Sequence, residues 1–245
     1  PDHFEILAVP GASAAIAQLP FLAPVGNVKI ASRTYNEHAA SFTSAGWTVT
    51  EASRDVSACV QVHPNNPDGK YTSAADLMGR LNIIDESFCD VVPAASFVHH
   101  PFRDDTIILK SFGKFWGLAG VRLGFVIGPG DMLYDLADRL GPWPVSGPAL
   151  HIGTAALNDQ MWADQTRISL ASDADRMDRL MTRAGADLVG GTSLFRLYKV
   201  SDAVQWQTRL AHHRIWTRVF PYEAGGIRLG LPGADGWPRL EAALA

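Results

Sequence analysis

Residues 107–125 read IILKSFGKFWGLAGVRLGF, two apolar segments separated by a glycine-rich connection. Residues 106–111 and 123–127 have the length and the apolar composition of buried β-strands. Lys114 and Arg122 are the charged residues of the connection between them. The stretch therefore predicts two strands of a covered sheet, with an amine presented where the first strand ends.

Apolar segments of strand length alternate with helical stretches through roughly the first 150 residues. Further strands are predicted at residues 4–9, 27–32, 47–51, 58–63 and 83–87, and helices at residues 34–45 and 73–81. Apolar strands without polar alternation, separated by helices, are typical of a mostly parallel sheet covered on both faces. We therefore predict an α/β fold with a large domain over residues 1–145, whose ligands gather at the strand ends.

The pattern changes after the segment Gly-Pro-Trp-Pro at residues 141–144. Helices are predicted at residues 147–157, 160–184, 203–212 and 237–244, and short strands at residues 195–200, 216–220 and 227–231. Long helices followed by short strands indicate a smaller α+β domain. We predict that this second domain covers residues 146–245.

Composition excludes several classes of protein. The 245 residues carry a formal net charge of −4, which argues against a dedicated nucleic-acid binder. The uncharged stretch at residues 6–28 contains three prolines, so we interpret it as buried core and predict no membrane span. Cys59 and Cys89 fit neither a disulfide framework nor a zinc site, which favours a reducing, cytoplasmic compartment. The adjacent histidines at 99–100 and 212–213 are predicted to be surface residues, and no metal site is predicted.

Two residues at strand ends point to a particular chemistry. Lys114 could be desolvated at the end of its strand and act as a nucleophilic amine, although a surface lysine on a loop is the alternative. Asp85 closes an apolar strand, where a buried carboxylate needs a cationic or hydrogen-bonding partner. A protonated pyridine nitrogen meets that need. An aspartate facing such a nitrogen, together with a Schiff-base lysine, marks pyridoxal phosphate sites.

The phosphate of such a cofactor needs donors. Residues 10–16 form a glycine turn that opens a helix, and the free N–H groups of a helix start favour an anion. Ser111 and Arg122 would complete the phosphate site, the arginine through paired hydrogen bonds. Taken alone, a glycine turn at a helix start is more often a helix cap without a ligand.

Five motifs follow one another along the chain: Gly-Ala-Ser at 11–13, Asn-Asn-Pro-Asp-Gly at 65–69, Asp-Glu-Ser-Phe at 85–88, Ser-Phe-Gly-Lys-Phe-Trp-Gly-Leu-Ala-Gly-Val-Arg at 111–122 and Ile-Arg-Leu at 227–229. Their order resembles the fold-type I pyridoxal-phosphate enzymes of the class I and II aminotransferase family. The resemblance implies that pyridoxal 5′-phosphate is the cofactor and that these enzymes work as homodimers.

The same resemblance assigns roles to individual residues. It implies that Lys114 and Asp85 are catalytic, Lys114 through a covalent bond to the cofactor and Asp85 through its pyridine nitrogen. It implies that Asn66 binds the ring oxygen and that Arg228 holds the substrate's α-carboxylate. Tyr35 matches a residue that stacks on the cofactor ring, and a half-buried tyrosine at a helix start is the alternative. The phosphate group would be held by Ala12, Ser13, Ser111 and Arg122.

Within this family, the sequence is most similar to the threonine-phosphate decarboxylases of cobalamin biosynthesis, relatives of histidinol-phosphate aminotransferase. The similarity lies in Asp68, Phe88 and the segment at residues 140–148. It implies decarboxylation of L-threonine O-3-phosphate to (R)-1-amino-2-propanol phosphate. An aminotransferase of the histidinol-phosphate type is the alternative, but such enzymes usually carry a tyrosine where this chain has Phe88. A non-catalytic protein with the same fold also stays open.

A second arginine is a candidate for the substrate's phosphate. If residues 216–220 and 227–231 form a hairpin around a turn at 223–226, Arg218 and Arg228 come close to opposite one another. A solvated strand arginine is the alternative for Arg218.

The spacing of the motifs also predicts missing segments. Family members carry an N-terminal arm before the glycine turn, whereas nine residues precede Pro10 here. The predicted helix at 73–81 runs directly into the next strand, although such connections usually need a few residues. We therefore expect the sequence to be part of a longer chain, with residues absent near 80–82.

Overall fold

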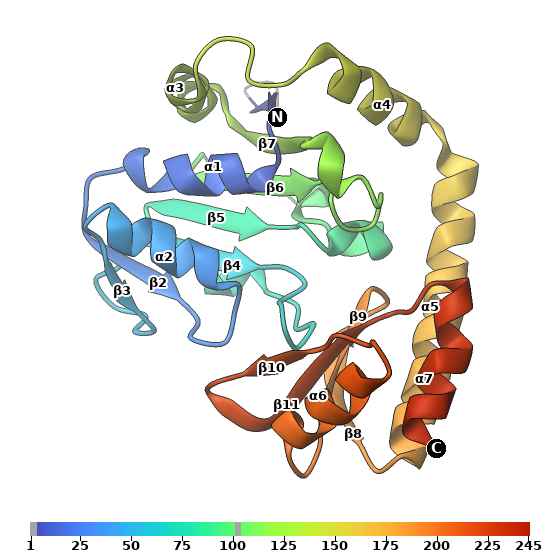
Figure 1. The fold of residues 1–245 in the computed structure, drawn as a ribbon. Helices are drawn as coiled ribbons and strands as arrows, with labels where there is room; N and C mark the ends of the chain where they lie inside the picture. The colour runs from blue at the N-terminus through green and yellow to red at the C-terminus, as the bar shows by residue number, and fades with distance from the viewer. Residues whose placement is uncertain (1–3, 101–103) are drawn as a thin grey trace. The chain divides into compact units, whose positions relative to one another are not determined.

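The computed structural model describes residues 4–100 and 104–245, which divide into two compact units. Unit 1 comprises residues 1–66 and 71–159, and unit 2 comprises residues 67–70 and 160–245. Figure 1 follows the chain through both units from its blue start to its red end. Within the described residues, no helix combines the length and the apolar character needed to span a bilayer. The domain boundary between residues 145 and 146 stays a prediction.

Unit 1 is built on a seven-stranded sheet of order β1-β7-β6-β5-β4-β2-β3. Its strands are β1 (Phe4–Val9), β2 (Asn27–Ile30), β3 (Thr48–Thr50), β4 (Ala58–Val62), β5 (Leu81–Asp85), β6 (Thr106–Ser111) and β7 (Gly124–Pro129). The pairs from β6 through β5, β4 and β2 to β3 are parallel, whereas β7 and β1 add antiparallel pairs at one side. The sheet is therefore mostly parallel, as predicted, and the carboxyl ends of β4, β5 and β6 share one edge.

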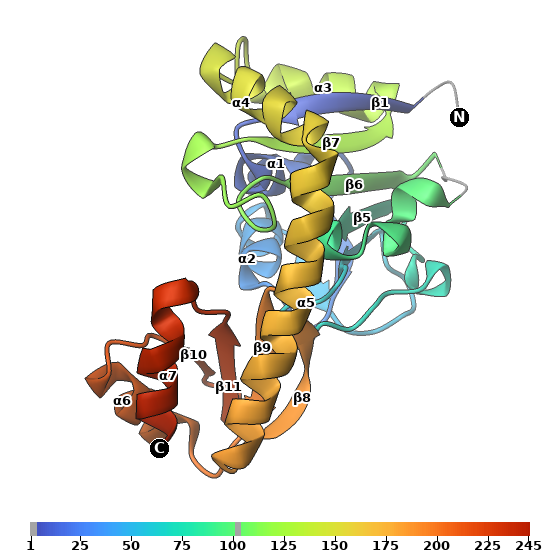
Figure 2. The same cartoon turned by 90° about the vertical axis from the view of Figure 1, so that its right-hand side faces the viewer.

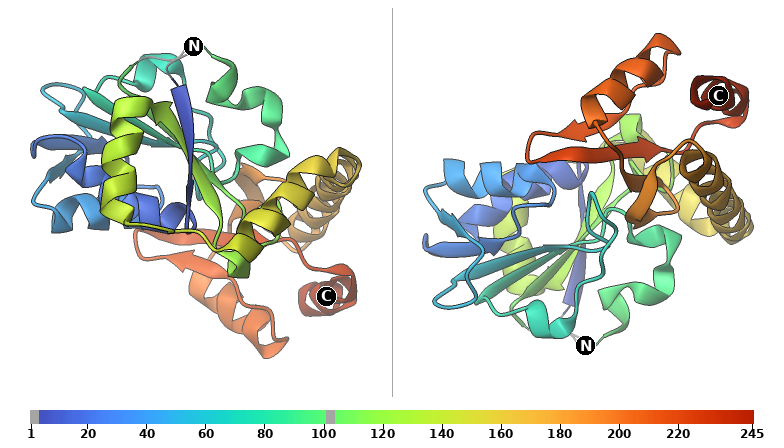
Figure 3. Two further views of the ribbon diagram at one scale, coloured as in Figure 1. Left: turned by 90° about the horizontal axis from the view of Figure 1, so that it is seen from above. Right: turned by 90° about the horizontal axis from the view of Figure 1, so that it is seen from below.

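The helices at residues 12–18, 36–44 and 130–140 cover one face of this sheet, and the 3-10 turns at residues 89–99 cover the other (Figure 3). The unit 1 helices are α1 (Ala12–Gln18), α2 (Asn36–Ser44), α3 (Gly130–Leu140) and α4 (Gly147–Asn158). The 3-10 helices are η1 (Leu19–Phe21), η2 (Ala74–Asp76), η3 (Cys89–Val91), η4 (Pro93–Ala95), η5 (Phe97–His99) and η6 (Ala119–Val121). Under α1 to α3, Ile83 and Ile107 belong to the main core, whereas Ile84 and Ile108 face Phe97 on the other side. Burial on both faces explains why these strands lack polar alternation.

The predicted helix at residues 73–81 is wrong. Only η2 forms there, capped by Ser73 and Asp76, before an extended connection to β5. Gly79 explains the difference, because the Asn82 side chain accepts from its N–H and donates to its C=O, both at 3.0 Å. A Cβ atom on Gly79 would also lie 2.7 Å from the backbone nitrogen of Cys59. Since no helix runs into β5, the geometric argument for residues missing near 80–82 no longer applies.

Unit 2 packs three helices against one face of a four-stranded antiparallel sheet of order β10-β11-β9-β8 (Figure 2). The strands are β8 (Asp187–Thr192), β9 (Phe195–Lys199), β10 (Arg218–Phe220) and β11 (Glu223–Gly230). The helices are α5 (Gln160–Arg183), α6 (Ala203–His212), α7 (Trp237–Leu244) and the short η7 (Ala234–Gly236). Met181, Trp206, Ile227 and Trp237 are among the residues that form their common core. The predicted α+β character is present, while β8 and, in unit 1, α3 were not predicted.

The hairpin of β10 and β11 differs in its turn from the prediction. Residues 223–226 belong to β11, so the turn lies at Pro221 and Tyr222. The register shifts after Val219, and this irregularity takes up the extra residues of β11. Arg218 nevertheless pairs directly with Arg228, in agreement with the prediction that the two arginines come close to opposite one another.

Candidate functional site

One cavity of unit 1 brings together side chains from separate parts of the chain. It is lined by every residue predicted to bind the cofactor, namely Ala12, Ser13, Tyr35, Asn66, Asp85, Ser111, Lys114 and Arg122. These residues come from the starts of α1 and α2, the ends of β4, β5 and β6, and the connection to β7. Ile16, Val62 and Phe88 add apolar surface. The fold therefore juxtaposes the eight residues at the carboxyl edge of the sheet, where α/β proteins bind ligands.

Asp85 is buried at the end of β5 and is held by three hydrogen bonds. His38 Nε2 lies 2.8 Å from Oδ2, while the backbone N–H and the hydroxyl of Ser87 donate to Oδ1 at 2.9 and 2.5 Å. Burial alone would raise the pKa of Asp85, but the contacts with His38 and Ser87 outweigh it and lower this pKa. The carboxyl group is therefore held as an anion inside the cavity wall.

His38 contacts the predicted catalytic residue Asp85, a contact that was not predicted from the sequence. It is fully buried on α2, three residues after Tyr35, so one helical turn carries it beneath the tyrosine. The two rings meet edge to face, with centroids 6.0 Å apart. A histidine one turn after the proposed stacking residue was the available signal, but its partner lies 47 positions away in the chain.

Lys114 lies in the turn that follows β6. The N–H of Gly117 donates to the Lys114 carbonyl at 3.0 Å, and the N–H of Leu118 donates to the carbonyl of Phe112 at 2.9 Å. The Lys114 amine lies 5.4 Å from the centroid of the Phe88 ring. Phe88 is thus an apolar wall beside the amine, without the hydroxyl that a tyrosine would place there.

Arg122 lies against the glycine turn at the start of α1. The residue adopts a left-handed backbone conformation with φ 55°, and its Nη1 donates to the carbonyl of Ala119 at 3.0 Å. A Cβ atom on Gly11, itself at φ 82°, would lie 2.5 Å from Nη2 of Arg122. One on Gly124 would lie 2.8 Å from the nitrogen of Ala12. These two glycines therefore let a guanidinium group and a helix start approach one another, an arrangement that favours an anion.

The loop before Tyr35 is tied to the end of β4. Thr34 donates its hydroxyl hydrogen to Oδ1 of Asn65 at 2.6 Å, and Nδ2 of Asn65 donates to the carbonyl of Arg33 at 3.0 Å. Tyr35 is partly buried at the start of α2, and burial raises its pKa. Asn65 therefore fixes the tyrosine at the cavity, while the next residue, Asn66, lines it.

Behind the cavity, a charged network connects the segments after β5 and β6. Lys110 Nζ donates to Glu86 Oε2 at 2.9 Å and to Asp90 Oδ1 at 3.0 Å. The hydroxyl of Ser96 and the N–H of Phe97 also donate to Glu86, at 2.5 and 2.6 Å. Burial would lower the pKa of Lys110, but Asp90 and Glu86 outweigh it and raise this pKa. The network orders the segment that follows Asp85.

Three side chains beside this network lie close enough together to hold a metal ion, but they already make other contacts within the protein. His63, Glu86 and Cys89 have the spacing of metal ligands among the described residues. Nδ1 of His63 accepts from the N–H of Thr72 at 3.0 Å, so Nε2 carries hydrogen and donates to the carbonyl of Ala95 at 2.9 Å. Burial raises the pKa of the Cys89 thiol to about 12. The Cys89 thiol therefore stays protonated, and His63 and Glu86 are already hydrogen-bonded within the core.

The two predicted substrate arginines form a cross-strand pair in unit 2. Arg218 lies opposite Arg228, so both side chains leave the same face of the sheet. The Arg228 guanidinium lies 5.3 Å from the centroid of the Phe195 ring. Burial and, secondarily, the charge of Arg218 lower the pKa of Arg228. Two like charges in this register favour an anionic ligand over that face.

Residues 54–235 match the family described as aminotransferase class I and II. The chain belongs to this family. It is 36% identical over 258 residues to a threonine-phosphate decarboxylase of Pseudomonas aeruginosa, covering 98% of this chain and 78% of that protein. A threonine-phosphate decarboxylase of Sinorhizobium sp is 38% identical over 261 residues, covering 98% and 77% respectively.

A solved aminotransferase structure shares the fold. A histidinol-phosphate aminotransferase from Sinorhizobium meliloti, in complex with pyridoxal-5′-phosphate, superposes with a TM-score of 0.83 at 18% identity. The match covers 98% of this chain and 75% of that one. The likeness confirms the predicted fold type, with its large and mostly parallel sheet.

The cofactor of the family is pyridoxal 5′-phosphate, and the cavity residues fit its three functional parts. An ionised Asp85 suits a protonated ring nitrogen, and the Lys114 amine suits an aldehyde carbon. Arg122 and the free N–H groups at the start of α1 suit a phosphate. The residues of this cavity therefore fit the cofactor.

Proposed function

We propose that the protein is a pyridoxal-phosphate-dependent lyase that converts L-threonine O-3-phosphate into (R)-1-amino-2-propanol phosphate and carbon dioxide. The observation that carries the proposal is the identity of 36% and 38% to two threonine-phosphate decarboxylases over 98% of the chain. The product is the aminopropanol phosphate used in cobalamin biosynthesis, and we place the protein in that pathway.

Within the cavity, Lys114 holds the cofactor and Asp85 balances the charge of its ring nitrogen. The bound cofactor supplies an electron sink for the pair left behind when carbon dioxide departs. Asp85 keeps that sink effective because its lowered pKa maintains a negative charge at neutral pH. The Lys114 amine is the group placed to return a proton to the carbon that has lost its carboxylate. Arg122, Ser111, Ala12 and Ser13 hold the phosphate, Asn66 holds the ring oxygen and Tyr35 stacks on the ring.

The substrate carries two anionic groups, and the chain offers two paired arginines. Arg228 would bind the α-carboxylate and Arg218 the phosphate. Their side chains repel each other across β10 and β11, and a dianionic ligand removes this repulsion. Selective binding of both anions would also exclude amino acids that lack a phosphate.

Phe88 supports a lyase over an aminotransferase. Its ring lies beside the Lys114 amine and has no hydroxyl to bond the cofactor. A histidinol-phosphate aminotransferase of Mycobacterium bovis is 27% identical over 269 residues, against 36% and 38% for the two decarboxylases. Transamination is therefore the alternative that the assay must exclude.

We further propose that the protein acts as a cytoplasmic homodimer. Cys59 and Cys89 are both free and buried, which suits a reducing compartment. Homodimers are the common state of the family that the sequence resembles. Sedimentation of the holoenzyme tests the oligomeric state.

The assay uses the holoenzyme and threonine phosphate, with and without a keto acid. We expect release of carbon dioxide that does not depend on the keto acid, and (R)-1-amino-2-propanol phosphate as the product. Lys114→Ala should abolish both this activity and the cofactor's absorbance, whereas Lys70→Ala, at an exposed lysine, should alter neither. Amine transfer that requires a keto acid would overturn the proposal.

A further inference from the structure

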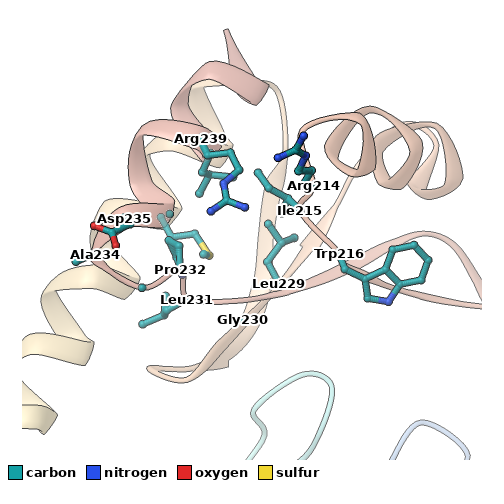
Figure 4. A pocket seen from close by; sticks show the side chains of 14 residues that line it. Arg214, Ile215, Trp216, Leu229, Gly230, Leu231, Pro232, Ala234, Asp235 and Arg239 are labelled. Carbon is teal, nitrogen blue, oxygen red and sulfur yellow. The ribbon is translucent and has the colours of Figure 1, made fainter.

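Unit 2 contains a cavity of its own, with a volume of about 510 Å³ (Figure 4). Ile215, Leu229 and Leu231 contribute apolar surface to it. Its volume lies in the range of sites for small organic ligands. Neither Arg218 nor Arg228 lines it, since strand alternation directs Arg228 and Leu229 to opposite faces of β11. The cavity is thus separate from the proposed substrate arginines.

Two guanidinium groups converge on this cavity. Arg214 follows the end of α6 and Arg239 belongs to α7, and Figure 4 shows both side chains directed toward the space above Ile215 and Leu229. Within residues 4–100 and 104–245, neither arginine forms an ion pair or a side-chain hydrogen bond. The carboxylate of Asp235 also lines the cavity and pairs with neither of them. Two cations with open donors over an apolar floor match a ligand that is both anionic and apolar.

The backbone conformation of Arg214 is uncommon for a residue that has a side chain. The residue has φ 59° and closes α6: its N–H donates to Ala211 at 2.8 Å, and the N–H of Ile215 donates to Leu210 at 3.0 Å. This position of a helix end is most often glycine, because a Cβ atom is disfavoured at positive φ. Glycine would end the helix with less backbone strain than arginine. An arginine here therefore points to a use for its guanidinium group.

An exposed indole completes the arrangement. Trp216 lines the cavity with 82% of its surface accessible, and Figure 4 places it at one side of the opening. Aromatic side chains bury large areas when a ligand covers them. We infer that the cavity binds a small organic anion, with its acidic head group between Arg214 and Arg239 and its flat apolar body on the Ile215 and Leu229 floor beside Trp216.

The test titrates 1-anilinonaphthalene-8-sulfonate, an aromatic anion, into the holoenzyme by calorimetry. We expect saturable binding that weakens roughly tenfold in Arg214→Gly and in Arg239→Gln, since each removes one charged donor. Arg179→Gln is the matched control, because Arg179 is exposed on α5 and does not line the cavity. Phenyl phosphate should displace the probe at lower concentration than inorganic phosphate.

Arg214→Gly also separates binding from folding. Glycine suits positive φ, so the thermal midpoint of this variant should equal or exceed that of the parent while probe binding falls. Absence of saturable binding to the parent protein, or equal affinity in the parent and both cavity variants, would overturn the inference. Neither result bears on decarboxylation, which the assay of threonine phosphate measures independently.

Discussion

The indole nitrogen of Trp116 donates a hydrogen bond to Oδ2 of Asp90 at 3.0 Å. Trp116 follows Lys114 by two residues, and Asp90 follows Asp85 by five, so the bond links the two segments that carry the proposed catalytic pair. Lys110 binds the other oxygen of Asp90. The turn of Lys114 is therefore anchored to the segment behind Asp85 by a partly buried carboxylate.

Trp116→Phe should weaken this anchor. The change leaves Asp90 Oδ2 without its indole donor, and we expect about 1–3 kcal/mol lower stability. We also expect several-fold lower cofactor affinity, because the Lys114 turn loses its attachment. Urea unfolding and titration with pyridoxal phosphate measure the two effects. Trp47→Phe is the control, since it removes a buried indole bond to Pro20 elsewhere: equal loss of cofactor affinity in both variants would contradict the prediction.

Gly11→Ala should damage the proposed phosphate site in a way that Gly46→Ala does not. Both glycines have positive φ, 82° and 87°, and Gly11 combines it with ψ 152°, a conformation almost confined to glycine, so both substitutions strain the backbone and Gly11→Ala strains it more. A Cβ atom at Gly46 would meet nothing within 4 Å, whereas one at Gly11 would lie against Arg122. We therefore expect a lower melting temperature for Gly11→Ala than for Gly46→Ala, and reduced cofactor affinity only in Gly11→Ala. Normal affinity in Gly11→Ala would remove Arg122 from the phosphate site.

His38→Ala should make the Asp85 carboxylate easier to protonate. In the native protein the pKa of Asp85 is lowered below its ordinary value, so its contribution to stability is present above that value and disappears as the pH falls through the lowered pKa. Without His38, only the Ser87 bonds oppose the effect of burial, so the pKa of Asp85 rises relative to the native protein. The acid limb of the activity profile should then move to higher pH, and cofactor affinity should fall.

Two variants make the His38 experiment decisive. His38→Gln retains a side-chain donor and should restore part of the activity and of the profile. His151→Ala replaces an exposed histidine of α4 and should leave the profile unchanged. An acid limb at the same pH in His38→Ala and the parent would show that Asp85 does not depend on this contact.

Arg218→Gln should lower substrate affinity while slightly raising the stability of the protein without substrate. The substitution removes the charge that helps to lower the pKa of Arg228. We expect KM for threonine phosphate to rise at least tenfold with little change in cofactor binding. Arg179→Gln on α5 is the charge-matched control. A KM equal to that of the parent would identify Arg218 as a solvated strand arginine.

Helix and strand bounds were predicted best where the spacing of apolar residues in the sequence matches the residues that are buried in the structure. The strands Phe4–Val9 and Thr106–Ser111 and the helices Ala203–His212 and Trp237–Leu244 have the predicted bounds. The segment at 73–81 failed because the side chain of Asn82 and the packing of Gly79 on β4 override helical spacing. Such tertiary contacts leave no periodic signal in the chain.

The site residues that belong to recognisable sequence motifs could be predicted, whereas those outside the motifs could not. The eight predicted cofactor residues line one cavity, although their roles stay predictions. His38 and the network of Lys110, Glu86 and Asp90 were missed, because each joins positions 20 or more apart in the chain. The cavity at Arg214 was also missed, since it arises from the packing of α6 and α7 beside β11.

The tetrapeptide Pro67–Lys70 belongs to unit 2, although the residues on either side belong to unit 1. Gly69 packs on the carbonyl of Gly191 in β8 so closely that no side chain fits between them. A gene cut once after Asp159 would therefore separate this tetrapeptide from the strand that receives it. Expressing either unit whole requires a rearranged gene in which residues 67–70 travel with residues 160–245.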